Sequence, residues 1–490
     1  MDTALVLALL AGATLLLLSV LASRLSSRLG IPALLLFLLI GMLAGSEGPG
    51  GIAFDNARLA MFVGSIALAL ILFDGGLQTE LEQLGRPQLR AGLILATLGV
   101  VITAAVVAAF CVLALGMSPL QGLLVGSVLS STDAAAVFSV LRARGVGLSP
   151  RLRSLIEFES GSNDPTAVFL TVAVISAAQL EAAEPWRLVL SFLFRMGGGV
   201  ALGWLAGRVL VWLLNRIDLE YDGLYSVLTL AAVGTMFGAA EAAGTSGFVA
   251  VYVAGLTMAG RIFVHHRSIV RFHEGLAWLM QVTMFLVLGL LVYPSHLARG
   301  IWPALAISAV LMLVARPAAT FPSLIGSGLS WRERHMVAWV GLRGAAPIIL
   351  ATFPLVAGLD TSGVIFNTVF VAVITSVLVQ GPTVSLVARR LGIAEPVTEP
   401  LRSPIDVDLP RDPTFSVKRL QIEAGSEADG KKLLAIGGPD RPLIVLIRRQ
   451  GCLFLPTGAS PLAAGDELFA LGSDESMQAL GQILRKPRIP

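Results

Sequence analysis

The sequence predicts an all-α domain that crosses a membrane many times, followed by a small soluble α+β domain. Composition is the first observation: 55% of the 490 residues are hydrophobic and 14% are charged, whereas soluble domains carry about 25% charged residues. Hydropathy is the second, because many uncharged stretches approach the ~20 residues needed to cross ~30 Å of hydrocarbon. The third is that every lysine follows residue 410, where the apolar pattern ends.

About thirteen apolar windows are expected to form the membrane spans. The first lacks the basic start and the small-residue cleavage site of a signal peptide, so we expect it to stay as a span. The windows are 3–22, 31–45, 57–78, 91–115, 118–141, 156–180, 188–214, 222–240, 246–262, 274–293, 300–326, 335–358 and 363–387.

The loop arginines predict the orientation of the chain. With the N-terminus outside, the inner loops hold sixteen arginines and the outer loops only Arg58, Arg187 and Arg299. Cytoplasmic loops are enriched in Lys and Arg. We therefore expect the N-terminus outside and the C-terminus in the cytoplasm.

The C-terminal part divides into a linker and a compact module. We place the membrane domain at 1–390, a proline-rich linker at 391–413 and the module at 414–490. Within the module, short β-like runs alternate with turn residues, and a short helix follows. A module of this size is too small for an independent enzyme, so we expect it to regulate the membrane domain or to help the protein assemble. The predicted strands are 414–424, 442–448 and 466–472, and the predicted helix is 474–485.

Two carboxylates are expected near the middle of the membrane, in neighbouring spans. Asp133 lies nine residues before Arg142, and Asp164 lies eleven residues after Arg153. At ~1.5 Å per residue, both carboxylates lie roughly 13–17 Å from the inner surface. Ionisable groups at that depth are costly and are functional candidates by default.

Further oxygen-bearing side chains surround these carboxylates. Glu159 and Asn163, like Ser160 and Asp164, are four residues apart and share one side of a helix. Thr132 precedes Asp133 in the partner span. Hard oxygen donors without sulfur or imidazole suit Na⁺ or K⁺. A buried carboxylate can hold a proton or a cation but not readily both, which is the minimum chemistry of a cation/proton exchanger.

Two other interpretations of the acidic pair were weighed. The polar groups could be hydrogen-bonding contacts between helices, although such contacts seldom need two carboxylates. Asp133 and Asp164 could form the dyad of an intramembrane aspartyl enzyme, which Asn163 and two nearby arginines disfavour. The two cysteines, Cys111 and Cys452, have no metal-ligand or disulfide spacing. No enzyme, resident metal or other cofactor is therefore expected.

Two arginines are also predicted deep in spans. Arg316 lies far from both ends of its window, and Arg343 lies nine residues past Arg334. A buried guanidinium keeps its charge and needs a carboxylate partner. We expect Glu159 to pair with one of them, preferably Arg316; the alternative is that both reach a membrane surface.

Small residues around Asp133 and from Gly341 to Pro347 predict two interrupted helices that meet at mid-membrane. The two interrupted helices fall in the fifth and the twelfth window. This separation of seven windows is expected of two inverted six-span repeats joined by one span. Asp74, at the end of window 57–78, could attract cations in a cytoplasmic funnel or simply end its helix. His265, His266 and His273 are expected in a solvated inner loop, with a pH sensor as the alternative.

These motifs resemble the monovalent cation:proton antiporter-1 family, which includes the NhaP proteins of bacteria and archaea. The resemblance rests on Ser131-Thr132-Asp133, on Glu159-Ser160-Gly161-Ser162-Asn163-Asp164 and on the segments LFDGGL, ARPAA and GLRGA, and it covers residues 1–390. The module, with DGKKL and GDELFALG, resembles an RCK C-terminal (TrkA-C) domain. The combination is similar to the potassium/proton antiporters of the NhaP branch.

The resemblance implies a NhaA/NhaP-like homodimer of thirteen-span subunits in the bacterial inner membrane, with a core domain that moves against a dimerisation domain. Asp164 would alternate between ion and proton, and Asn163 would mark an electroneutral member. Thr132, Asp133 and Ser160 would line the ion site, while Glu159 would pair with an arginine. One departure is Ala134, where many relatives carry proline.

The expected function is exchange of cytoplasmic K⁺ for external H⁺, one for one, by alternating access, for potassium and pH homeostasis. Exchange of Na⁺ for H⁺ is the alternative. A cation channel gated by an RCK domain is less favoured, because no TVGYG-like filter is present. The expected partners are the lipid bilayer and a second copy of the chain, with no nucleic acid. The module could bind a small ligand such as a nucleotide.

Overall fold

The computed structural model describes most of the chain in two compact units. The first unit comprises Met1–Leu213, Ser226–Arg261 and Val270–Val397, and the second comprises Leu214–Tyr225, Ile262–Ile269 and Thr398–Pro490. The described residues are 3–29, 32–179, 185–359, 362–396, 415–423, 425–436, 441–449 and 452–485. Most of the predicted linker therefore lies outside the described residues.

Each of the thirteen predicted windows falls on helical structure in the first unit. Nine windows coincide with one uninterrupted helix each, because their apolar runs contain no extended break. These helices are α1 (Thr3–Leu29), α2 (Ala33–Ala44), α3 (Ala57–Gln78), α8 (Pro150–Gln179), α9 (Pro185–Arg216), α10 (Asp222–Ala242), α11 (Gly247–Ala259), α12 (His266–Leu290) and α18 (Ser362–Arg390).

The other four windows are divided. The fourth window contains α4 (Arg86–Ile94), the π-helical turn η2 (Leu95–Gly99) and α5 (Val100–Leu115), and the eleventh contains α14 (Ile301–Val310), the π-helical turn η3 (Leu311–Ala315) and α15 (Arg316–Ser323). The fifth contains α6 (Pro119–Val128) and α7 (Ala134–Ala143), and the twelfth contains α16 (Trp331–Trp339) and α17 (Ala346–Val356). Among the described residues, seven helical segments are long and apolar enough to cross a membrane, so the chain is a multi-pass membrane protein.

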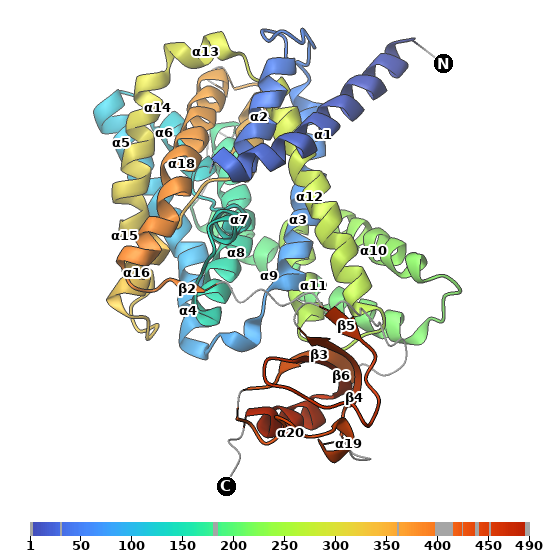
Figure 1. The fold of residues 1–490 in the computed structure, drawn as a ribbon. Coiled ribbons are helices and arrows are strands. Elements are labelled where there is room, and N and C mark those ends of the chain that lie inside the picture. The colour runs from blue at the N-terminus through green and yellow to red at the C-terminus, as the bar shows by residue number, and fades with distance from the viewer. Residues whose placement is uncertain are drawn as a thin grey trace. The chain divides into compact units, whose positions relative to one another are not determined.

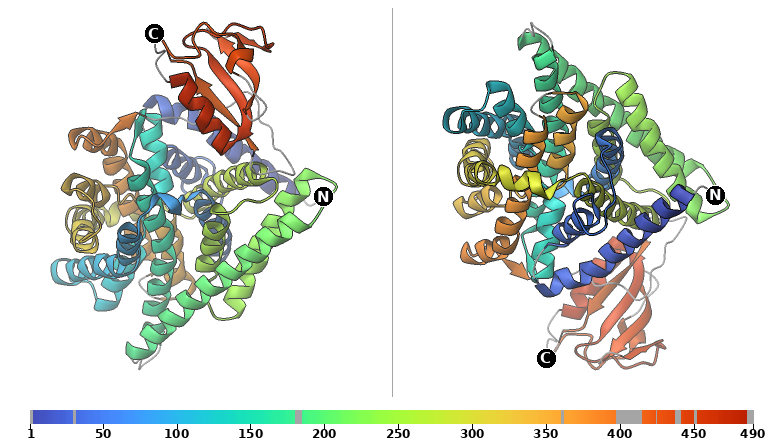
Figure 2. Two further views of the ribbon diagram at one scale, coloured as in Figure 1. Left: turned by 90° about the horizontal axis from the view of Figure 1, so that it is seen from below. Right: turned by 90° about the horizontal axis from the view of Figure 1, so that it is seen from above.

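The helices of the first unit gather around α8 (Figure 1). On one side, α5, α6, α14, α15 and α18 pack together; on the other lie α3, α11 and α12 (Figures 1 and 2). Helix α8 contacts α6 of the first group, α7, which also packs on α18, and α3 and α11 of the second group. Its two sides therefore face different helix groups, and the polar residues predicted on α8 lie where these groups meet.

Local sequence explains where the interrupted helices begin. Ser118 and Gln121 form a capping box before α6, and Ser330 and Glu333 form another before α16. At the second break, Pro347 occupies the first turn of α17, where a missing amide hydrogen costs little.

The C-terminal module is a four-stranded antiparallel sheet with one flanking helix. The strand order is β3 (Phe415–Gln421), β6 (Glu467–Ser473), β4 (Leu443–Arg449) and β5 (Cys452–Phe454). Helix α20 (Asp474–Arg485) has a strong apolar face, and Met477, Leu480 and Leu484 pack on Leu468 and Ala470. The predicted strands and helix correspond to β3, β4, β6 and α20; β5 and α19 (Leu433–Ile436) were not predicted, because they are too short to show a period.

Two features differ from the expectations. Glu395 and Pro396 form β2, which pairs with β1 (Val146–Gly147), so the start of the predicted linker is part of the first unit. The solvated-loop expectation is wrong for His265 and His273, which are both buried; His273 lies in α12 with its ring 4.8 Å from that of Phe73. Helix α12 begins eight residues before its apolar window, since its first two turns are amphipathic.

Candidate functional site

The two interrupted helices meet at their breaks. The amide of Asp133, in the extended segment between α6 and α7, donates to the carbonyl oxygen of Leu342 at 2.8 Å. Gly344 lies directly against Asp133: a Cβ at Gly344 would be 1.9 Å from Oδ2 of Asp133. The small residues predicted at both breaks therefore permit direct main-chain contact between them.

Arg343 bridges the same two breaks. Its Nη1 donates to the carbonyl oxygen of Ser130 at 3.1 Å and also to that of Ser131, and its own amide donates to Oγ of Ser376 at 3.1 Å. The side chain is 1% exposed. It binds main-chain oxygens left free by the interrupted α6, and none of these hydrogen bonds involves Glu159.

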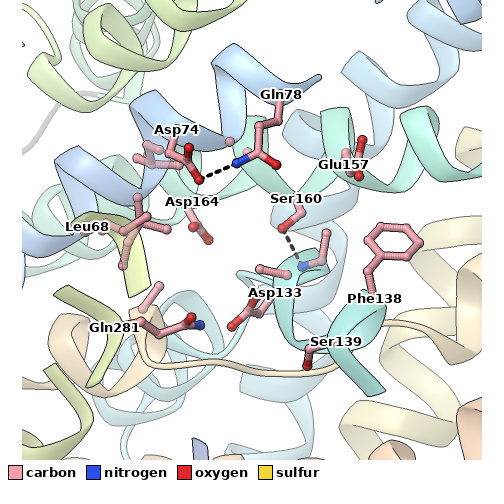
Figure 3. A pocket seen from close by; sticks show the side chains of 18 of the residues that line it. Leu68, Asp74, Gln78, Asp133, Phe138, Ser139, Glu157, Ser160, Asp164 and Gln281 are labelled. Carbon is pink, nitrogen blue, oxygen red and sulfur yellow. Dashed lines mark hydrogen bonds between the residues drawn. The ribbon is translucent and has the colours of Figure 1, made fainter. Parts of the chain in front are cut away.

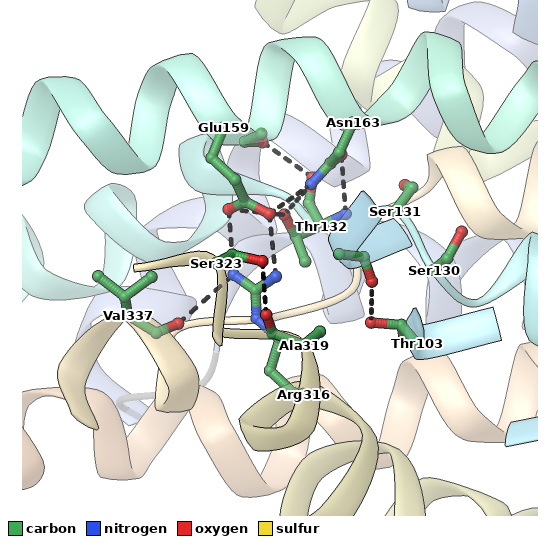
Figure 4. A network of polar contacts seen from close by, with 12 residues as sticks. Thr103, Ser130, Ser131, Thr132, Glu159, Asn163, Arg316, Ala319, Ser323 and Val337 are labelled. Carbon is green, nitrogen blue, oxygen red and sulfur yellow. Dashed lines mark hydrogen bonds and ion pairs between the residues drawn. The ribbon is translucent and has the colours of Figure 1, made fainter. Parts of the chain in front are cut away.

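Glu159 and Arg316 form a buried bidentate ion pair (Figure 4). Arg316 Nη1 and Nη2 donate to the two Glu159 oxygens at 2.9 and 3.0 Å, and Nη2 also lies 3.4 Å from the carbonyl oxygen of Val337. Arg316 directly follows the π-helical turn η3. The structure thus brings together the two residues that the sequence analysis preferred as partners.

Asn163 belongs to this polar network (Figure 4). Its Nδ2 donates to Glu159 Oε1 at 2.9 Å and to Thr132 Oγ1 at 2.6 Å, while its Oδ1 accepts from the Thr132 amide at 3.2 Å. Asn163 is fully buried. Its amide therefore links the ion pair to the break in the fifth window.

Ser160 and Asp133 hold the start of α7. Ser160 Oγ donates to the Thr132 carbonyl oxygen at 2.8 Å and accepts from the Ala134 amide at 2.9 Å. Asp133 is the N-cap residue of α7, and its Oδ1 accepts from the Ala136 amide at 3.0 Å. Both side chains keep a face toward a cavity.

Asp164 differs from the other acidic residues of the site. It is buried, and its Oδ1 has no hydrogen-bond partner among the described residues. It lines a cavity of about 210 Å³ together with Thr132, Asp133 and Ser160. Figure 3 shows the Asp133 and Asp164 carboxylates pointing into the same open space. Glu159 and Asn163 are absent from the cavity lining, so the structure separates a paired network from a cavity-facing carboxylate pair.

Another part of the cavity wall carries further polar groups (Figure 3). Asp74 lines it, with Oδ2 accepting from Gln78 Nε2 at 2.7 Å and Oδ1 unpartnered among the described residues. The lining also includes Gln281 and Glu274 from α12. It extends to Arg142 near the C-terminal end of α7 and to Arg153 near the N-terminal end of α8. The cavity thus connects Asp164 with the end of the helices that carries arginines.

Sequence reasoning missed three residues of this wall. Gln281 and Glu274 could have been predicted from the sequence, because each is a polar residue within or next to an otherwise apolar window. Tyr252 had no such signal: it is 3% exposed, its hydroxyl lies 3.4 Å from the Phe158 carbonyl oxygen, and its ring fills the space beside Gly161. The place of Tyr252 in the wall depends on tertiary packing alone.

The oxygen donors of the cavity suit a hard monovalent cation or a proton. Among the described residues, no cluster of three or more His, Cys, Asp or Glu side chains is placed to hold a metal ion. The Asp133 and Asp164 carboxylates and the Thr132 and Ser160 hydroxyls line one cavity. Such oxygens can bind a weakly held cation, and the carboxylates can instead be neutralised by protons.

Comparisons with known proteins find relatives along most of the chain. The family described as "Sodium/hydrogen exchanger, transmembrane" matches residues 13–390. The K(+)/H(+) antiporter NhaP2 of Shewanella sp. strain MR-4 is 40% identical over 477 residues, which cover 97% of this chain and 82% of that protein. The K(+)/H(+) antiporter NhaP of Alkalimonas amylolytica is 44% identical over 380 residues, covering 78% of this chain and 66% of that protein.

The fold is similar to that of the sodium proton antiporter MjNhaP1 of Methanocaldococcus jannaschii. The TM-score is 0.68 at 24% sequence identity, and the match covers 78% of this chain and 100% of that chain. At this identity the likeness concerns the fold alone.

Proposed function

Because the chain belongs to the sodium/hydrogen exchanger family, we propose that it is a secondary antiporter that exchanges K⁺ for H⁺ across a bacterial inner membrane. The single observation that carries this proposal is Asp164, a buried carboxylate with an unpartnered oxygen that faces a cavity beside Asp133. A cation and a proton compete for such a group. The names of the relatives favour K⁺ as the cation.

Asp164 is the shared site in this mechanism. A cation entering the cavity meets the Asp164 and Asp133 carboxylates, with Thr132 and Ser160 oxygens at the same wall. When the cation leaves, a proton neutralises Asp164. The paired network of Glu159, Asn163 and Arg316 lies behind this wall and stays charged and hydrogen-bonded through the cycle.

The stoichiometry proposed is one cation for one proton. Asn163 stands beside Asp164, where a second carboxylate could carry a second proton, and its amide is hydrogen-bonded to Glu159 and Thr132. Each cycle then moves one positive charge in each direction. K⁺-driven exchange on a solid-supported membrane should therefore produce no transport current, and a transport current would contradict this stoichiometry.

Alternating access is proposed through inverted repeats. Paired irregularities support it: π-helical turns occupy the fourth and eleventh windows, and extended breaks occupy the fifth and twelfth. The cavity opens toward the end with Arg142 and Arg153, which the positive-inside rule assigns to the cytoplasm. The conformation is therefore taken as inward-facing, in a thirteen-span subunit of a homodimer with its N-terminus outside.

The C-terminal module is proposed to be an RCK C-terminal-like regulatory domain, with a small ligand of unassigned class. A ligand changes activity through its difference in affinity between two transport states, commonly ~1–3 kcal/mol. A protein ending after residue 396 keeps β2 paired with β1. It should still exchange ions, with an altered pH dependence; a folded but wholly inactive truncated protein would show that the module is part of the transport machinery.

The central experiment is ion flux in proteoliposomes with an imposed pH gradient, comparing K⁺, Na⁺, Rb⁺ and Li⁺. K⁺ and Rb⁺ should dissipate the gradient most efficiently; a response restricted to Na⁺ and Li⁺ would establish the Na⁺/H⁺ alternative. Asp164→Asn should abolish the response while the protein remains folded. Glu82→Gln, at an exposed carboxylate, is the matched control and should exchange normally.

A further inference from the structure

An open groove of about 600 Å³ lies between α9 and α11, and it shares no lining residue with the cavity of the candidate site. Gly203 and Gly207 of α9 bring the two helices together, because a Cβ at these positions would be 2.3 and 2.9 Å from the carbonyl oxygens of Ala250 and Ala254. Trp204 follows the first of these glycines and stands at the edge of the helix contact. The lining residues of this α9–α11 groove are Leu81, Trp204, Val253, Leu256, Thr257, Gly260 and Arg261.

Two arginines flank the α9–α11 groove. Arg261 lines it directly after the end of α11, and the Arg208 guanidinium lies over the Trp204 ring, 4.7 Å from the ring centroid. Both arginines are exposed, and no carboxylate pairs with either of them in the part of the chain that the structure describes. Glu80 and Glu82, the acidic residues closest in sequence to a lining residue, do not line the groove. The groove therefore has a positive charge without a protein counter-charge.

The two arginines belong to the same level of the helix contact. A Cβ at Gly207 would be 2.9 Å from Cβ of Thr257. Arg208 follows Gly207 directly, and Arg261 lies four residues, about one helical turn, beyond Thr257. Gly260 adds no wall at this end, since a Cβ there would meet nothing within 4 Å.

This level coincides with a boundary of the membrane. Arg187 and Arg208 are 21 residues apart on α9, which is roughly 32 Å of helix and matches the ~30 Å thickness of the hydrocarbon. A tryptophan accompanies each arginine, because Arg187 lies 5.5 Å from the ring centroid of Trp186. Tryptophan is enriched at both membrane interfaces. In the proposed orientation, Arg208 and Arg261 lie at the inner leaflet.

We propose that the α9–α11 groove binds an anionic phospholipid of the inner leaflet. The lipid phosphate accepts charge-assisted hydrogen bonds from Arg208 and Arg261. One acyl chain occupies the apolar part of the groove, along Leu81, Val253 and Leu256. A basic site at the membrane surface attracts anionic headgroups. The proposal depends on the proposed orientation and is independent of which cation the protein exchanges.

Lipid binding to the purified full-length protein, measured by native mass spectrometry, tests the site. The probes are dioleoylphosphatidylglycerol and, with the same acyl chains and no net charge, dioleoylphosphatidylcholine. The anionic lipid should bind more tightly. Arg208→Gln and Arg261→Gln should each weaken its binding about fivefold, which corresponds to ~1 kcal/mol for one basic residue near the surface. Arg187→Gln is the matched control, since it removes the arginine over a tryptophan at the other boundary, and it should bind as the parent does.

A steric variant separates the groove from its charge. Gly260→Leu keeps both arginines and fills the groove, and the φ of −82° at Gly260 accepts a side chain. It should also weaken binding of the anionic lipid, whereas Arg208→Lys should retain most of it and guards against a folding defect.

Three outcomes would overturn the proposal. The first is equal affinity of the parent and Arg208→Gln for the anionic lipid, and the second is equally tight binding of the neutral lipid by the parent. The third is a dimer that dissociates in Arg208→Gln whatever lipid is present, which would assign this arginine to a contact between two copies of the chain. Cation flux plays no part in these measurements, so failure of the proposed antiport would be seen separately.

Discussion

The Asp133 amide donates to the Leu342 carbonyl oxygen, so two helix breaks far apart in sequence satisfy one another's main chain. Inside a membrane, an unpaired main-chain group is costly, and extended segments persist only where protein surrounds them. Arg343 adds two charge-assisted hydrogen bonds to the same crossing. The crossing therefore acts as one structural element, although each break is encoded separately.

Arg343→Gln should destabilise this crossing. The Ser130 and Ser131 carbonyl oxygens would lose a charged donor, and each unsatisfied buried group costs ~1–3 kcal/mol. The unfolding temperature in detergent should fall clearly, with partial recovery in Arg343→Lys. Arg58→Gln, at an exposed side chain, serves as control. An unchanged unfolding temperature would mean that the crossing does not depend on the guanidinium.

The Glu159–Arg316 pair should behave as one unit. Removing one partner of a buried pair typically costs ~3–5 kcal/mol, because the remaining charge is left uncompensated. Glu159→Gln and Arg316→Gln should each lower thermal stability, while the double variant should lose less than the sum. Strictly additive losses would show that the two residues do not interact.

Ala134→Pro should change cation affinity more than stability. Proline suits the first turn of α7, and Asp133 already has the extended conformation favoured before proline. The substitution removes the amide donor to Ser160 Oγ. The freed hydroxyl oxygen faces the cavity, so the apparent KM for the cation should decrease in vesicle flux assays. In a Ser160→Ala background the same substitution should leave KM unchanged; a decrease there would refute this role.

Asp466→Asn should reduce stability of the C-terminal sheet in a pH-dependent way. Burial would raise the pKa of Asp466, but hydrogen bonds from Arg449, at 2.7 and 2.6 Å, and from the Ala463 amide hold that pKa below its usual value. A lowered folded-state pKa gives stability that is present above the unfolded value of about 3.9 and is lost as pH falls through the folded value.

Hydrogen exchange of the β6 amides in the full-length protein provides the measurement. At neutral pH, Asp466→Asn should exchange faster than the parent, and the difference should shrink below about pH 4. A constant difference across this range would exclude the carboxylate charge as the cause.

The helix pattern was predictable because each membrane window depends only on the hydropathy of adjacent residues. The Glu159–Arg316 preference was predictable for a related reason: a deep arginine needs a carboxylate, and few carboxylates lie at that depth. The early start of α12 was not predictable, since His266–His273 is amphipathic and the ring of its last residue, His273, packs against Phe73 from a distant helix.

Which residues of the site face the cavity, and which belong to the paired network, could not be predicted either. Glu159, Asn163 and Asp164 share one helix and one depth, and sequence spacing gives no reason for one to face a cavity. Which of them does so depends on where Thr132 approaches from the crossing helix. Likewise, Tyr252 enters the cavity wall only because Gly161 leaves room for its ring.

The position of Arg343 has a consequence for selectivity. Its guanidinium occupies the Ser130 and Ser131 carbonyl oxygens, which are the same kind of ligand that replaces the hydration shell of K⁺ in channel filters. The positive charge of the Arg343 side chain thus occupies the place where an unwound helix would otherwise offer a row of carbonyl ligands to an ion. In the proposed antiport, an ion arriving at Asp164 would find these ligands already taken, so it would rest in the cavity and would not pass through the helix break as through a pore.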